Sequence, residues 1–119
     1  MSDFDTKTFA DEIDVLNPGE KVLVFERRQF DNDVRRHFSG IVQVCSAIAF
    51  RAIGYTFIYR PVAATFARKP EKRTRIISFN NFVVINILPE SFDLENAQYK
   101  ATDSGTIFTD GSSYQLDVS

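Results

Sequence analysis

The sequence predicts a mostly β protein: a small five-stranded, strongly bent antiparallel barrel with an N-terminal α-helix and a C-terminal extension. Two observations predict the barrel. Apolar segments of strand length follow one another between Lys21 and Leu88, separated by turn residues. Gly40 lies inside the longest of these segments, and a glycine within a strand often marks the sharp bend that a small barrel needs.

The expected elements follow in chain order. Residues 6–16 predict a helix, because Phe9, Ile13 and Leu16 share one face and Asn17-Pro18-Gly19 supplies a turn that ends it. Strands are expected at residues 21–28, 35–48, 50–59, 75–79 and 82–88, with a connection over residues 61–74 and a tight turn at Asn80-Asn81.

The domain organisation is a barrel with its helix over residues 1–89 and an acidic extension over residues 90–119. Within the extension, residues 106–109 and 114–118 flank Asp110-Gly111, which favours a hairpin. A mobile acidic tail is the alternative.

Composition limits the class of protein. A chain of 119 residues with 44% hydrophobic residues and twelve Phe can build one ordered core. It has no apolar run of the ~20 residues that a membrane-spanning helix needs, so no membrane partner is expected. The acidic N-terminus is unlike a signal peptide, and the single Cys45 suggests a reducing compartment. We therefore expect a cytoplasmic protein.

The net charge of −2 conceals a segregation of charge. Residues 1–20 carry six acids against one Lys, and residues 90–119 carry six acids against Lys100. Residues 21–89 carry twelve Lys and Arg against four acids. The positive charge therefore belongs to the predicted barrel, where it could recruit a polyanion that the acidic ends could mask. An ordinary solvated surface is the alternative.

Catalytic and metal-binding chemistry is not predicted. His37 is the sole His and lies in a predicted strand. A metal site or a nucleophile pair would need partner residues, and the chain offers no second His and only one Cys. An exposed strand histidine is the simpler interpretation. No glycine-rich phosphate loop or nucleophile motif is present, so neither an enzyme nor a cofactor is expected.

Two basic clusters are the candidate phosphate-binding sites. One flanks the first predicted turn and the other occupies the connection before residue 75. Their members are Arg27, Arg28, Arg35 and Arg36, then Arg68, Lys69, Lys72, Arg73 and Arg75. Arginines bind phosphates bidentately, and Phe30 and Phe66 are placed to stack on bases. A solubilising edge and loop is the alternative.

Several strings resemble the Sm/LSm family of RNA-binding barrels, in a divergent form of bacterial or phage type. These are residues 16–24, the segment Phe38-Ser39-Gly40-Ile41-Val42, and residues 77–85 around Asn80-Asn81. The sequence departs from the family's base-reading signature, which would place an Asp and a Met-Asn pair where Ser46, Ala49 and Phe50 stand.

The resemblance implies a homo-oligomeric ring of about five to seven subunits, in which the fourth and fifth predicted strands pair edge to edge between neighbouring subunits. It implies that Phe82, Val83, Val84 and Ile85 form the subunit interface, although burial within one chain explains the same apolar run. It also places Phe79, Asn80 and Asn81 near the pore as base-binding residues, whereas a turn and a core aromatic are the structural alternative.

Together these inferences predict a non-catalytic, ring-forming protein that binds single-stranded RNA through its basic clusters. The alternative is a structural or protein-interaction module that forms the same ring without RNA.

Overall fold

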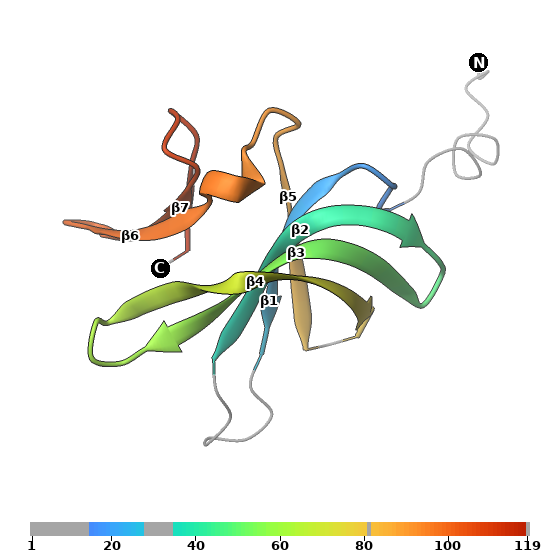
Figure 1. Cartoon of the computed structure of the whole chain (residues 1–119), viewed down its shortest axis with the longest axis horizontal. Helices are drawn as coiled ribbons and strands as arrows, with labels where there is room; N and C mark the ends of the chain where they lie inside the picture. Colours follow the sequence, from blue (N-terminus) through green and yellow to red (C-terminus); the bar gives the residue numbers. More distant parts are fainter. Residues whose placement is uncertain (1–14, 28–34, 81, 119) are drawn as a thin grey trace, which may run out of the picture.

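The computed structural model describes residues 15–27, 35–80 and 82–118, and these form two antiparallel sheets. The first sheet contains β1 (Lys21–Glu26), β2 (Arg36–Cys45), β3 (Ala49–Arg60), β4 (Thr65–Ser78) and β5 (Val83–Leu88). A 3-10 turn, η1 (Leu94–Asn96), leads into the second sheet of β6 (Gln98–Thr102), β7 (Gly105–Thr109) and β8 (Gln115–Asp117). The mostly β class is thus confirmed (Figure 1).

The closed barrel is wrong. The strand order of the first sheet is β4-β3-β2-β1-β5, so β4 and β5 are its two edges and do not pair with each other. The sheet bends strongly but stays open (Figure 1). One apolar face of the first sheet is instead covered by the second sheet. That face is therefore buried although the edge strands β4 and β5 do not pair.

The N-terminal α-helix is also a correction. Most of its expected range, residues 6–14, lies outside the described residues, and Val15 and Leu16 form a bend rather than a helical turn. Pro18 follows closely and disfavours helical backbone at the residue before it. Within the described ranges, η1 is the single helical element.

The connection expected at residues 61–74 is mostly strand. Pro61 ends β3 as expected, but β4 begins at Thr65 and runs to Ser78. A three-residue segment, Lys69-Pro70-Glu71, lies opposite Thr56 where the β3–β4 register shifts. This irregularity, on an edge strand, accommodates a proline that cannot donate to the ladder.

The bend of the sheet depends on two glycines that face each other. Gly40 of β2 pairs with Gly54 of β3. A Cβ on Gly54 would lie 1.9 Å from the carbonyl oxygen of Ser39, and one on Gly40 would lie 2.6 Å from that of Ile53. The backbones approach too closely here for any side chain, so both positions require glycine.

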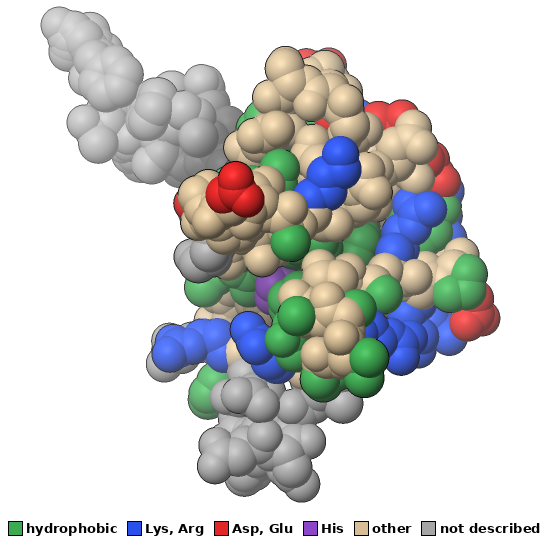
Figure 2. Space-filling model, turned by 90° about the vertical axis from the view of Figure 1, so that its left-hand side faces the viewer, with side chains coloured by type: hydrophobic (Ala, Val, Ile, Leu, Met, Phe, Trp, Pro, Cys, Tyr) green, Lys and Arg blue, Asp and Glu red, His purple; other side chains and the backbone are tan. Residues whose placement is uncertain are grey.

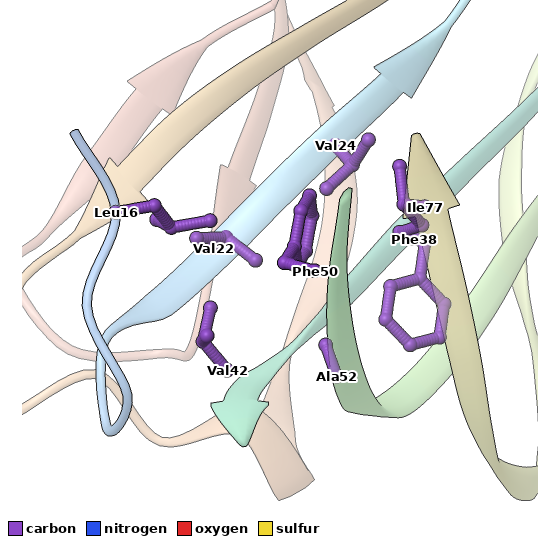
Figure 3. Close-up of a cluster of buried hydrophobic side chains, with 8 residues drawn as sticks. All are labelled: Leu16, Val22, Val24, Phe38, Val42, Phe50, Ala52 and Ile77. Carbon is purple, nitrogen blue, oxygen red and sulfur yellow. The ribbon is translucent and has the colours of Figure 1, made fainter. Parts of the chain in front are cut away.

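One face of the first sheet, here called the inner face, encloses the first core cluster. Leu16 joins the cluster from the segment before β1. The other members come from the strands: Val22, Val24, Phe38, Val42, Phe50, Ala52 and Ile77 (Figure 3). All eight are almost completely buried, so the continuous apolar character of β1 reflects burial rather than an exposed ribbon.

The opposite face, here called the module face, packs against the C-terminal module, defined as residues 90–118. Phe92, Tyr99 and Phe108 of the module bury against Leu23 and Phe57 of the sheet. The Nζ of Lys21 donates to the backbone carbonyls of Glu90 and Phe92, at 2.7 and 2.6 Å. The module is therefore a docked second sheet, in which β7 and β8 form a hairpin around residues 110–111.

Across the described ranges, we find no helix with the length and apolar character required to cross a membrane.

Candidate nucleic-acid interface

A basic groove lies on the inner face of the first sheet. Residues of β2, β3 and β4 line it, close to the β3–β4 hairpin. Its volume is about 340 Å³. Four cationic side chains line it, together with Thr56, Ile58 and Thr74; the cations are Arg36, Lys69, Arg73 and Arg75. Figure 2 looks at the end of the molecule that carries this hairpin and shows Lys and Arg side chains on both flanks of it.

The pairing of strands explains why these cations converge. Arg75 pairs with Ala52 and Arg73 with Gly54, so both point to the inner face. Arg36 pairs with Ile58 one strand away and points to the same face. Residues from two distant chain segments thus form one surface.

The groove keeps an excess of positive charge. Arg75 contacts the Glu26 carboxylate at 3.5 Å and lies 5.7 Å from the centroid of the Phe38 ring. Arg73 contacts Glu71 at 3.4 Å. Four positive charges against two negative ones leave an excess of two, and Arg36 and Lys69 form no ion pair within the described ranges.

The other two cations of β4 point to the module face. Arg68 pairs with Phe57 and Lys72 with Tyr55, both of which face the C-terminal module. There the cations contact the module at Glu95. The cluster at residues 68–75 is therefore not a single patch, because alternation along a strand divides it between two faces.

The first basic cluster is divided in the same way. The guanidinium of Arg35 lies over the Tyr59 ring at 4.7 Å and near the Phe66 ring at 5.8 Å, on the module face. Arg27 is exposed beyond the end of β1, and its backbone N–H donates a hydrogen bond to the backbone carbonyl of Phe82. Arg28, like Phe30, lies outside the described residues. Among the described members of this cluster, Arg36 alone lines the groove.

The residues expected near a pore have local structural contacts. The Phe79 ring packs on Phe50 at a centroid distance of 5.5 Å. The Oδ1 of Asn80 accepts a hydrogen bond from the backbone N–H of Phe82 at 2.8 Å, which is turn chemistry. Asn81 lies outside the described residues.

The expected subunit interface alternates between buried and exposed side chains. Val83 and Ile85 pack against the first core cluster of the same chain. Phe82 and Val84 are 45% and 48% exposed at the free edge formed by β5. Half of this run is thus explained within one chain, and half is left at the surface.

His37 has a role that the sequence did not indicate. Its ring stacks on Phe66 at 4.1 Å and contacts Phe25 at 4.3 Å, and its Nδ1 is hydrogen-bonded to the Tyr99 hydroxyl. Burial, followed by the nearby charge of Arg35, lowers the pKa of His37 from 6.5 to about 4. The expected exposed histidine is instead a neutral residue between the two sheets.

The aromatic neighbours of His37 come from β1, β4 and β6, which are far apart in the chain, so no local sequence pattern indicates that they meet. Burial also raises the pKa of Tyr99. In the described part of the chain, no group of three or more His, Cys, Asp or Glu side chains is arranged to hold a metal ion.

Comparison with known proteins adds no assignment: no family model, no curated protein and no solved structure matches this chain.

Proposed function

We propose that this protein binds single-stranded RNA without catalysis, and that the basic groove holds the phosphate backbone. The observation that carries the proposal is the convergence of Arg36, Lys69, Arg73 and Arg75 on one groove with an excess of positive charge. Guanidinium groups pair with phosphate oxygens in a bidentate geometry. Such contacts fix a nucleic acid in place without reading its sequence.

The lining of the groove supports backbone recognition. Its neutral members are Thr56, Ile58 and Thr74, so none of the described residues that line it is an aromatic that could stack on a base. The hydroxyl of Thr56, which pairs with Phe38 and so lies on the same face as the cations, can hydrogen-bond to a 2′-hydroxyl, which favours RNA over DNA. We therefore expect weak preference among base sequences.

Binding of a fluorescent oligo-uridine, followed by anisotropy over a series of salt concentrations, tests this proposal. The logarithm of the affinity should fall with the logarithm of the salt concentration with a slope of roughly −2 to −3, because each phosphate contact to a single strand contributes about −0.7. The double variant Lys69→Ala, Arg73→Ala should flatten this slope by about 1.4.

Lys100→Ala is the matched control. Lys100 is an exposed cation on β6 that does not line the groove, so its loss should leave the slope unchanged. Binding that ignores salt, or that the double variant and the control weaken equally, would contradict a role for the groove. Single-stranded DNA of matching sequence should bind more weakly than RNA.

We propose self-association as a second property, because the free edge of β5 carries exposed apolar side chains. Phe82, Val84 and Ile87 are each almost half exposed there, and Ile76 is 73% exposed on β4 at the opposite edge. An exposed apolar edge strand is a template for pairing with another chain. The resemblance noted in the sequence implies the same pairing between β5 of one copy and β4 of the next.

The lengths of the strands make the two proposals compatible. β5 has six residues and β4 has fourteen, so a pairing that ends at Ser78 extends back to Arg73 and leaves residues 68–72 outside it. It engages Arg73 and Arg75 through their backbone groups, while their side chains stay on the inner face. Light scattering on the purified protein should show an oligomer that Val84→Lys disrupts. Val62→Lys, on the exposed β3–β4 turn, is the control that should not disrupt it. A monomeric wild-type protein would overturn self-association and leave the groove proposal intact.

A further inference from the structure

The carboxylate of Glu95 is held by a set of donors typical of an anion-binding site. The Tyr55 hydroxyl donates to its Oε1 at 2.6 Å, and the Lys72 ammonium contacts its Oε2 at 2.7 Å. Arg68 donates to the backbone carbonyl of the same residue at 2.5 Å. Each carboxylate oxygen thus has its own donor, and a guanidinium lies beside them.

The donors are also organised among themselves. The Arg68 guanidinium lies 4.5 Å from the centroid of the Tyr55 ring, and the Lys72 ammonium lies 5.6 Å from it. Stacking on this ring keeps both cations at the site without a carboxylate. The hydrogen bonds from Lys72 and Tyr55 lower the pKa of Glu95, so the anionic form is the one that the site favours.

The site lies directly behind the groove. Arg68 immediately precedes Lys69, and Lys72 immediately precedes Arg73. Arg68 and Lys72 project from the face of β4 opposite to that of Lys69 and Arg73. The site is open to solvent, since the Lys72 and Glu95 side chains are 47% and 58% exposed. An external phosphate can therefore reach the same donors.

We propose that Tyr55, Arg68 and Lys72 form a second phosphate-binding site, which Glu95 occupies in the free protein and vacates for the RNA backbone. The inference rests on the proposed function, because the phosphates come from the same bound strand. Carboxylate and phosphate oxygens accept the same charge-assisted hydrogen bonds, so one replaces the other without rebuilding the site.

Displacement involves the Glu95 side chain rather than the whole C-terminal module. The module is anchored by Phe92, Tyr99 and Phe108, which are buried against the first sheet. An exposed ion pair contributes little by comparison, because water and salt screen it. Glu95 can therefore leave the site while the module stays docked. Because its carboxylate competes with phosphate for the same donors, Glu95 lowers the affinity for RNA.

The test compares Glu95→Gln with Asp103→Asn in the full chain, using the fluorescent oligo-uridine over the same salt series. Both variants remove one negative charge from the module, but Asp103 contacts none of the three donors. Glu95→Gln should bind about 3- to 10-fold more tightly at low salt, with a slope steeper by about 0.7 for one added phosphate. Asp103→Asn should change the affinity by less than about 2-fold, as expected for a remote screened charge.

Adding Arg68→Ala and Lys72→Ala to Glu95→Gln should return the affinity to the wild-type value. Circular dichroism on every variant establishes that the fold is retained. Equal affinities for Glu95→Gln and Asp103→Asn would overturn the second site.

This outcome is distinct from failure of the proposed function. If the groove variant weakens binding while Glu95→Gln has no effect, the groove stands and the second site falls. If neither the wild-type protein nor Glu95→Gln binds oligo-uridine, both proposals fall.

Discussion

Acidification should destabilise the protein through His37. The ring lies between the two sheets against Phe25, Phe66 and Tyr99, where a positive charge would lose hydration. Its pKa falls from 6.5 in the unfolded chain to about 4 in the folded one. The unfolded chain therefore binds the proton more readily, and stability is complete above pH 6.5 and declines as the pH falls toward 4.

The size of the effect follows from these two values. With 1.36 kcal/mol for each pKa unit, the free energy of unfolding should fall by about 2 kcal/mol between pH 7 and pH 5. It should fall by about 3 kcal/mol by pH 4. These figures are upper limits, because part of the ring is in contact with water, which screens the charge. A loss of this size is a substantial share of the ~5–15 kcal/mol that stabilises a typical domain.

Urea unfolding at pH 7 and pH 5, followed by circular dichroism, measures the loss. The matched control is His37→Phe, which keeps the aromatic contacts and cannot be protonated. It should be less stable at pH 7, since Tyr99 loses a hydrogen-bond partner, but its stability should not change between the two pH values.

Asp110 does not interfere in this range. Hydrogen bonds, above all from Ser112, lower the pKa of Asp110 from 3.8 to about 2, so its contribution is lost only below about pH 3.8. If the wild-type protein and His37→Phe lose the same free energy between pH 7 and pH 5, the reasoning about His37 is wrong.

Three substitutions test the packing. Phe108→Ala should lower the free energy of unfolding by about 3–5 kcal/mol in urea titrations, because the ring is fully buried between the sheets; a loss below about 1 kcal/mol would contradict the docked module. Gly54→Ala should cost at least about 1–3 kcal/mol in thermal unfolding, because its Cβ would overlap the Ser39 carbonyl. Asn80→Ala should cost about 0.5–1.5 kcal/mol by losing the acceptor for Phe82 N–H, and an unchanged melting temperature would refute that turn.

Much of the first sheet could be predicted from local pattern. The apolar runs in β1 and β5 and the turn residues between strands indicate where strands lie. A constraint at Gly40 was also predictable, because a glycine in the interior of a long strand commonly marks a bend or a close approach of two backbones. Its partner Gly54 was not, since a clash between two backbones depends on the register of β2 against β3.

The candidate site was predictable in its charges but not in its geometry. The basic residues of β4 stand out in the sequence, yet residues 61–74 read as a connection because Pro70 and five charged residues lack strand periodicity. Once β4 is a strand, alternation sends Lys69 and Arg73 to the inner face and Arg68 and Lys72 to the module face. No pattern in the chain indicates that Glu95 meets the second pair.

By itself, the sequence determined that the chain is mostly β and that its positive charge lies between two acidic ends. These properties are local, because side-chain type and spacing along the chain set them. The tertiary structure alone decided that the sheet stays open, that the acidic C-terminal segment docks as a second sheet, and that the basic cluster is divided between two faces. Those outcomes depend on which strands pair and which apolar faces meet, and such contacts join residues far apart in the chain.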